Sequence, residues 1–90
     1  MSFAELGEQL RHARELRGLS LRDLKQSTRI RVKYLRALEE GDLDVLSTEV
    51  QLRGFLRNYA QHVGLDPESA MRRLQQAIQG TKKRRWQSLF

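Results

Sequence analysis

The amino-acid sequence predicts an all-α protein with five helices. Apolar side chains recur at intervals of three and four residues along most of the chain, which is the period of an α-helix. No stretch shows the apolar–polar alternation of a half-buried β-strand. Glycines and a single proline divide the chain into segments of helical length. Because the chain has 90 residues, these segments are expected to share one small hydrophobic core.

The first two helices are predicted to begin at capping boxes, in which a serine is followed three residues later by an acid. Ser2 and Glu5 open the first helix, which ends at Gly18. Ser20 and Asp23 open a shorter second helix. The stripe of the first helix that is expected to face the core consists of Leu6, Leu10, Ala13 and Leu16.

A third helix is predicted from Ile30 to Gly41, after a connector at residues 26–29. At about 100° per residue, this helix has an apolar arc and a polar side. The arc expected to face the core consists of Tyr34, Leu35 and Leu38. The side expected to face solvent consists of Lys33, Arg36, Ala37 and Glu40. A short helix that follows a capped helix through a tight turn is the arrangement of a helix-turn-helix.

The fourth helix is predicted to begin after Ser47 or Thr48 and to end at Gly64. Its apolar arc consists of Leu52, Phe55, Leu56, Tyr59 and Val63. The fifth helix is predicted from "DPES" at residues 66–69, which places an acid at the N-cap and proline at the first helical position, and it ends at Gly80. Its inner stripe consists of Ala70, Met71, Leu74 and Ile78.

Positive charge is concentrated at the C-terminus. Its distribution predicts a domain at residues 1–80 and a basic tail at residues 81–90. The net charge is +6 at pH 7, and four of the cations are Lys82, Lys83, Arg84 and Arg85. This charge favours an anionic partner, either nucleic acid or a lipid surface. The chain has no cysteine, which excludes disulfides and thiolate metal sites. Without a run of about 18 apolar residues or a signal-peptide pattern, we expect a soluble chain that is not exported.

The sequence does not predict an enzyme. His12 and His62 are solitary, no pair of carboxylates has evident partners, and neither a glycine-rich phosphate loop nor metal-ligand spacing occurs. Each histidine is therefore expected at the surface or its boundary. We expect no catalytic residue, no metal site and no cofactor.

The motifs resemble known helix-turn-helix families. The segments "LGEQLRHARELRGLSLRDL" and "IRVKYLRALEEGD" resemble the repressor-like family of phage repressors and their bacterial relatives. Three segments show a closer similarity to one branch of these proteins, and they are "GLSLRDL", "TRIRVKYLRALEEGDLDVL" and "RGFLRNYAQHVGLDPE". They resemble the cytoplasmic domain of the RodZ family, whose members are membrane-anchored bacterial cell-shape proteins. The resemblance implies a five-helix, repressor-like helix-turn-helix domain with a basic C-terminal tail. It also implies a structural salt bridge between Arg14 and Glu39.

The RodZ resemblance implies a cytoplasmic adaptor that binds the actin-like filament protein MreB and tethers it to the inner face of the cell membrane. In that family, an aromatic residue at the position of Phe55 and another one turn earlier help to bind MreB, whereas this chain has Gln51 at the earlier position. From its spacing alone, Phe55 could also belong simply to the core. The partner-binding surface is expected at Gln51, Phe55, Arg57, Asn58 and His62. The residues that match the basic segment before the family's membrane span are Lys82, Lys83, Arg84, Arg85 and Trp86.

The alternative function is a DNA-binding transcriptional regulator of the repressor-like family. The residues that could contact phosphates or guanine are Arg22, Arg29, Arg31, Lys33 and Arg36. Residues 31–40 contain no Asn, Gln, Ser or Thr, so the side-chain amide that usually reads adenine is missing. DNA-binding relatives favour Gln, Ala and Gly where this chain has Leu21, Lys25 and Arg29. We therefore expect DNA binding to be weakly specific and to weaken steeply with salt.

Overall fold

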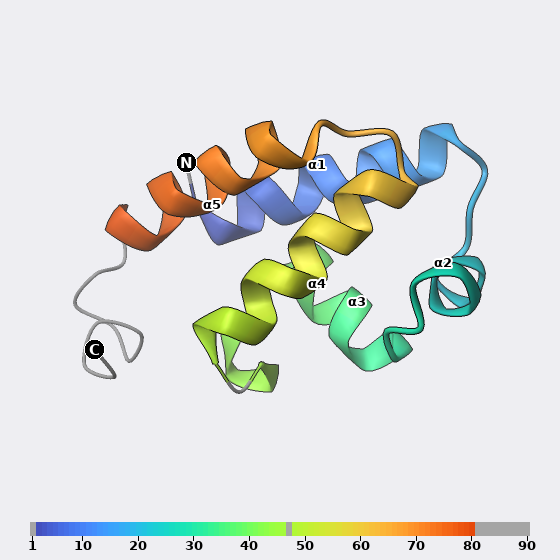
Figure 1. The fold of residues 1–90 in the computed structure, drawn as a ribbon, viewed down its shortest axis with the longest axis horizontal. Coiled ribbons are helices and arrows are strands. Elements are labelled where there is room, and N and C mark those ends of the chain that lie inside the picture. Colours follow the sequence, from blue (N-terminus) through green and yellow to red (C-terminus); the bar gives the residue numbers. More distant parts are fainter. Residues whose placement is uncertain (1, 47, 81–90) are drawn as a thin grey trace.

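The computed structural model describes residues 2–46 and 48–80 as a helical domain (Figure 1). The described residues form five α-helices and one short 3-10 helix, and they contain no β-strand, so the all-α prediction is confirmed. The helices are α1 (Phe3–Leu16), α2 (Leu21–Thr28), α3 (Val32–Glu40), η1 (Leu43–Val45), α4 (Glu49–His62) and α5 (Pro67–Gly80). The predicted basic tail, residues 81–90, lies outside the described residues.

The α1 and α5 helices lie side by side and run in opposite directions, and α4 runs obliquely between this pair and α3 (Figure 1). The most extensive contacts join α1 to α3 and α4 to α5. The α2 helix packs on both α3 and α4. Because α4 contacts α2, α3 and α5, it connects the helix-turn-helix pair to the rest of the domain.

The two predicted capping boxes are confirmed. Ser2 Oγ accepts a hydrogen bond from the Glu5 amide at 3.1 Å, and Glu5 Oε1 accepts one from the Ser2 amide at 2.8 Å. Ser20 and Asp23 form the same reciprocal pair at the start of α2. The side chain of Thr48 caps α4. Each cap satisfies backbone groups that have no partner within the helix, which fixes where these helices begin.

The turn between α2 and α3 lies at residues 29–31, whereas the predicted connector was residues 26–29. Thr28 explains the difference, because its hydroxyl donates to the Leu24 carbonyl at 2.6 Å and accepts from the Ile30 amide at 3.1 Å. These bonds support helical structure through Thr28 and hold the next residues against the end of α2. Ile30 is buried in the turn and is not part of α3, so the predicted start of the third helix is wrong.

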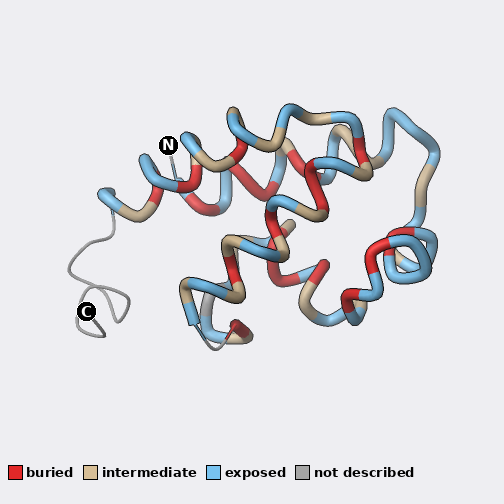
Figure 2. Tube along the Cα trace, in the orientation of Figure 1, coloured by how far each residue is buried: buried red, intermediate tan, exposed pale blue. Residues whose placement is uncertain are grey.

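The core lies where the inward faces of the helices meet, and Figure 2 shows buried residues along each of them. The largest fully buried side chains are Leu10, Leu24, Leu35, Leu46, Leu56, Tyr59 and Leu74. Other predicted core residues are only partly buried and pack against this cluster, namely Ala13, Tyr34, Phe55, Met71 and Ile78. The apolar stripes of the sequence therefore identify most of the core.

Two predictions about the core are wrong. Leu16 is 75% exposed, because it lies about 80° around the helix from Leu6 and so leaves the buried arc. Ala37 is buried, because α1 and α3 pack closely at Gly7. A Cβ atom added at Gly7 would lie 2.6 Å from the carbonyl oxygen of Leu38, so small residues are needed where these helices meet.

Candidate functional site

A buried polar cluster joins α1, α3 and α4. Arg14 Nε donates to Glu39 Oε2 at 2.6 Å, and Arg14 Nη2 donates to Glu39 Oε1 at 3.1 Å. The Tyr59 hydroxyl also donates to Glu39 Oε2, and it lies 3.3 Å from the Leu10 carbonyl oxygen. Arg14 Nη1 donates to the Leu19 carbonyl at 2.8 Å. The expected ion pair between Arg14 and Glu39 is therefore formed, with side-chain exposures of only 13% and 7%.

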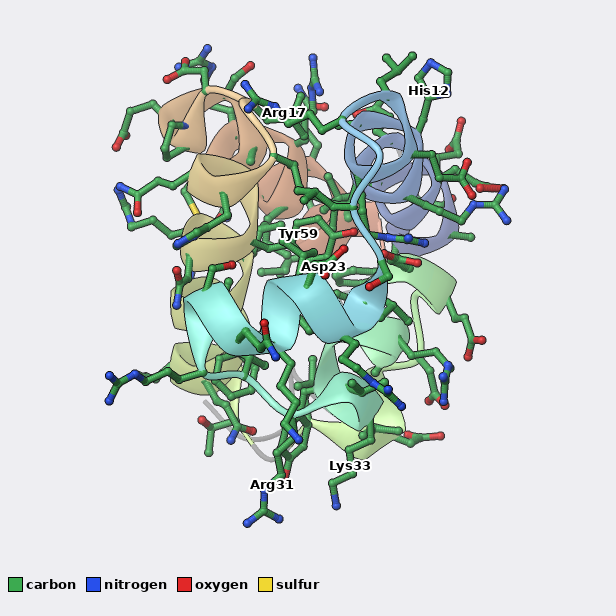
Figure 3. The ribbon with its side chains drawn as sticks, turned by 90° about the vertical axis from the view of Figure 1, so that its right-hand side faces the viewer. His12, Arg17, Asp23, Arg31, Lys33 and Tyr59 are labelled. Carbon is green, nitrogen blue, oxygen red and sulfur yellow. The ribbon has the colours of Figure 1, made fainter. Side chains whose placement is uncertain are left out.

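The surroundings of this cluster raise the pKa values of two of its groups, Tyr59 and Arg14. Burial, followed by the hydrogen bond to Glu39, raises the pKa of the Tyr59 hydroxyl, so Tyr59 stays protonated. The hydrogen bond to Glu39 raises the pKa of the Arg14 guanidinium, so Arg14 stays cationic. Figure 3 shows Tyr59 in the interior of the bundle. The cluster thus holds three helices together, which is a structural role.

An aromatic pair lies at the surface between α3 and α4. The ring centroids of Tyr34 and Phe55 are 5.4 Å apart, with an angle of 43° between the ring planes. This tilted contact has a separation that is favourable for aromatic pairs. Both side chains are half-buried and pack against the core from its edge. Their inner sides are held by the domain while part of each ring remains accessible to a partner.

The other residues expected at the partner surface also lie on α4, and several contact the domain itself. Asn58 Nδ2 donates to the Thr28 carbonyl at 3.2 Å, which joins α4 to the end of α2. His62 Nδ1 lies 2.8 Å from the Asn58 carbonyl oxygen. Arg57 forms an exposed ion pair with α5 at 2.9 Å. Gln51 is half-buried in the first turn of α4.

The cations expected to contact DNA are exposed and lie on α2, on α3 and in the turn between them. They are Arg22, Arg29, Arg31, Lys33 and Arg36. Lys33 Nζ lies 5.0 Å from the ring centroid of Tyr34, which is a cation–π contact. Within residues 2–46 and 48–80, none of the five forms an ion pair. Figure 3 shows Arg31 and Lys33 extending into solvent from the same edge of the domain.

An open groove of about 430 Å³ lies between α1, the start of α2 and the second half of α3. Its lining residues are Ala4, Glu8, Arg11, Leu21, Arg36, Glu39 and Glu40. Charges of both signs lie along the groove, and Arg11 Nη2 donates to Glu8 Oε2 at 2.8 Å. Among the described residues, no three His, Cys, Asp or Glu side chains are grouped closely enough to hold a metal ion.

The contacts that the sequence predictions missed include the hydrogen bond of Tyr59 to Glu39 and that of Asn58 to the end of α2. A sequence signal exists for the first, because a buried tyrosine hydroxyl usually needs a polar partner and Glu39 borders the buried arc of α3. The second depends on how α4 crosses α2, which spacing along the chain does not determine.

Comparison with known proteins identifies the family. A protein-family model described as a helix-turn-helix domain matches residues 9–70, which include α2, the turn, α3 and α4. The chain belongs to this helix-turn-helix family. The family and the relatives described next point to a structural or regulatory protein rather than to an enzyme.

Two relatives make the assignment more specific. The chain is 43% identical over 63 residues to the cytoskeleton protein RodZ of Streptococcus pneumoniae (strain ATCC BAA-255 / R6), and this match covers 70% of the chain and 23% of the relative. It is 44% identical over 50 residues to the uncharacterized membrane protein YmfM of Bacillus subtilis (strain 168), and this match covers 56% of the chain and 17% of the relative. No solved structure matches the chain. The chain is thus a RodZ-like helix-turn-helix domain that spans about a fifth of the length of these two relatives.

The residues expected at a membrane surface, residues 82–86, lie outside the described part of this RodZ-like domain. In the part that the structure describes, no helix combines the length and the apolar character that crossing a membrane requires.

Proposed function

We propose that this RodZ-like domain belongs to a cytoplasmic adaptor that binds an MreB-like filament protein and tethers it to the membrane for cell-shape control. Its similarity to a relative named as a cytoskeleton protein supports the filament partner. Its similarity to a relative named as a membrane protein supports the location at the inner face of the cell membrane.

The aromatic pair is the observation on which the filament-binding surface depends. Phe55 packs against Tyr34 with a centroid distance of 5.4 Å, so its orientation is fixed before a partner arrives. A side chain that is already ordered loses little conformational entropy on binding, and a buried aromatic anchor can contribute about 2 kcal/mol or more to an interface. This preorganised ring supports partner binding at α4, although this chain has Gln51 where the RodZ family has its other aromatic residue, one turn before Phe55.

The tail provides the second contact of the proposed adaptor. Lys82, Lys83, Arg84 and Arg85 are followed by Trp86, a combination that favours an anionic lipid surface. At about 1 kcal/mol for each basic residue near such a surface, the tail supplies reversible adhesion. Two weak contacts, one with the filament and one with the membrane, reinforce each other through a high effective concentration.

Replacing Phe55 with serine tests the filament contact. We expect Phe55→Ser to abolish co-sedimentation of the chain with MreB filaments while its circular dichroism spectrum and unfolding transition show a folded domain. Leu16→Ser is the matched control, because Leu16 is also apolar but is 75% exposed at the far end of α1. Unchanged co-sedimentation of a folded Phe55→Ser variant would remove this surface from the proposal.

The second candidate function is a DNA-binding regulator. It is favoured by the five exposed cations on α2, on α3 and in the turn between them, because none of them forms an ion pair within the described residues. Its test is selection from a random pool of duplexes near physiological salt, with excess bulk competitor to suppress binding by the tail. A regulator should enrich one sequence. Enrichment of no sequence would show that any DNA binding is electrostatic and non-specific.

A further inference from the structure

Residues 24–38 form a continuous basic segment of the helix-turn-helix. This segment contains five cations and no acid, and the cations are Lys25, Arg29, Arg31, Lys33 and Arg36. All five side chains are exposed, and none forms an ion pair within residues 2–46 and 48–80. The other charged side chains of the domain include several matched pairs, such as Arg53 with Glu49 at 2.8 Å. The basic segment therefore has charge that the described domain does not neutralise.

The charges of α3 are ordered against the helix dipole. Acids are favoured near the N-terminus of a helix and cations near its C-terminus. The first turns of the other α-helices follow this rule with Glu5, Asp23, Glu49 and Glu68. The first turn of α3 has no acid, its N-cap residue Arg31 makes no side-chain capping bond, and Lys33 is its second residue. The stability of α3 alone does not explain these cations.

Arg29 shows a second departure from what the fold favours. It ends α2 in the left-handed conformation, with φ 65° and ψ 20°. Glycine is the usual residue at such a position, because the Cβ atom of a larger residue strains the left-handed conformation. The Arg29 side chain is exposed. A strained backbone that supports an exposed cation indicates a role for that side chain outside the domain.

The basic segment is continuous with the aromatic pair. Lys33 Nζ lies 5.0 Å from the ring centroid of Tyr34, and the Tyr34 ring lies 5.4 Å from that of Phe55. Asn58 of α4 donates to the Thr28 carbonyl at 3.2 Å, immediately before Arg29. Contacts between α3, α4 and the turn therefore place the backbone that carries these cations beside the two aromatic rings.

We propose that the partner surface on α4 extends across Tyr34 onto the turn and the first half of α3, and that it binds an acidic segment of the filament partner. An apolar side chain of that segment contacts Tyr34 and Phe55, while its carboxylates face Arg29, Arg31 and Lys33. This inference rests on the proposed function and adds the chemistry of the partner. The acidic character of the partner segment follows from charge complementarity. The surface carries five cations that have no ion pair within the described domain, and they lie beside an aromatic pair that can bind an apolar side chain.

The composition of the surface favours an acidic protein segment over duplex DNA. An aromatic pair at the α3–α4 junction provides an anchor for an apolar side chain, which a phosphate backbone does not supply. Residues 31–40 have no amide or hydroxyl side chain of Asn, Gln, Ser or Thr to read bases. Glu40 is exposed at the end of α3 and would repel a phosphate backbone along that helix.

Charge reversal tests the proposal. Arg31→Asp and Lys33→Glu each change the charge by two units within the proposed surface. Arg72→Glu makes the same change at an exposed residue of α5 and is the matched control. Affinity for MreB filaments is measured by co-sedimentation of the full chain at low and physiological salt. We expect the first two variants to weaken binding by about tenfold and to reduce its salt dependence, because like charges then face the acidic segment. The control should bind within about twofold of the original chain.

Arg29→Gly adds a variant that separates binding from folding. Glycine relieves the left-handed strain and removes the cation, so the domain should become more stable while filament binding weakens several-fold. Loss of binding together with increased stability cannot be explained by unfolding.

The outcomes separate this inference from the proposed function. If Phe55→Ser abolishes filament binding but the Arg31, Lys33 and Arg29 variants bind like Arg72→Glu, the acidic segment is excluded and the α4 contact remains. If these variants weaken binding to a duplex while filament binding is unchanged, the basic segment is a nucleic-acid surface and the proposal is overturned. If the original chain does not bind filaments, the proposed function fails, and the acidic-segment proposal fails with it.

Discussion

At the end of α3, Glu39 accepts hydrogen bonds from Arg14 and Tyr59, and the backbone packs directly against Gly7 of α1. At its beginning, Arg31 has no capping bond and Lys33 extends into solvent (Figure 3). These two halves of one nine-residue helix differ in whether their charges have partners inside the described domain. The comparison shows that paired, enclosed charge fixes the fold, whereas unpaired, exposed charge is available to a binding partner.

The contrast also explains why the acids near the end of α3 do not form one uniform negative surface. Glu39 points inward and is 7% exposed, so its charge is matched by Arg14. Glu40, the next residue, is exposed and belongs to the rim of the groove beside α1. Neighbouring residues with the same charge thus have different roles, because a turn of about 100° separates them around the helix.

The largest expected effect comes from breaking the enclosed half of α3. Glu39→Ala leaves the Arg14 guanidinium, which is 13% exposed, without its carboxylate partner. Removing one member of a buried ion pair typically costs about 3–5 kcal/mol. We expect a decrease of that size in the free energy of unfolding, measured by urea denaturation. The control Glu40→Ala changes an exposed acid and should remain within about 0.5 kcal/mol of the original chain. Equal effects for the two variants would contradict the structural role of the buried pair.

A somewhat smaller loss is expected where α1 meets the same half of α3. The added Cβ atom in Gly7→Ala would lie 2.6 Å from the Leu38 carbonyl oxygen and would also overlap the Glu39 carbonyl, so the helices must move apart. Overpacking of this kind typically costs about 1–3 kcal/mol. Gly54→Ala is the matched control, because a Cβ atom there meets nothing within 4 Å, and alanine should stabilise α4 by up to about 1 kcal/mol. Thermal unfolding of both variants would show shifts of opposite sign.

The Tyr59 hydroxyl gives a third, pH-dependent prediction. Tyr59→Phe removes its hydrogen bond to Glu39 and should lower the free energy of unfolding by about 1–2 kcal/mol near neutral pH. Because burial raises the pKa of Tyr59 in the folded state, the unfolded chain ionises first as pH rises. The stability contributed by this hydroxyl is therefore complete below about pH 10 and decreases above it. Urea denaturation at a series of pH values should show that the difference in stability between the original chain and the Tyr59→Phe variant becomes smaller above that pH. A difference that stays constant would contradict the raised pKa of Tyr59.

Most of the fold could be predicted from local chemistry. Helical periodicity places the buried leucines, and the hydroxyls of Ser2 and Ser20 mark where two helices begin. The α2–α3 turn could not be placed as well, because the Thr28 hydroxyl bonds both to its own helix and to the next turn. Such a residue is compatible with a connector or with a helix end, and the sequence alone does not choose between them.

The arrangement of the candidate site depends more strongly on packing between helices than the positions of the helices themselves do. The position of Phe55 at the rim of the α4 arc could be predicted from periodicity, but its contact with Tyr34 depends on the distance and angle between α3 and α4. The burial of Ala37 likewise depends on the close approach of α1 at Gly7. Periodicity assigns each residue to a face of its own helix, and it does not specify which neighbouring helix covers that face.

The smallest expected effect is a gain in stability at the beginning of α3, where the charges have no partner within the described domain. Arg31 is the N-cap residue with an extended backbone, φ −61° and ψ 147°, which an aspartate can adopt. In Arg31→Asp, the carboxylate can accept a hydrogen bond from the first turn and interact favourably with the helix dipole. The combined gain should be about 1 kcal/mol in the free energy of unfolding, measured by urea denaturation. A decrease in stability would instead show that Arg31 supports the fold, and the distinction between the two halves of α3 would then fail.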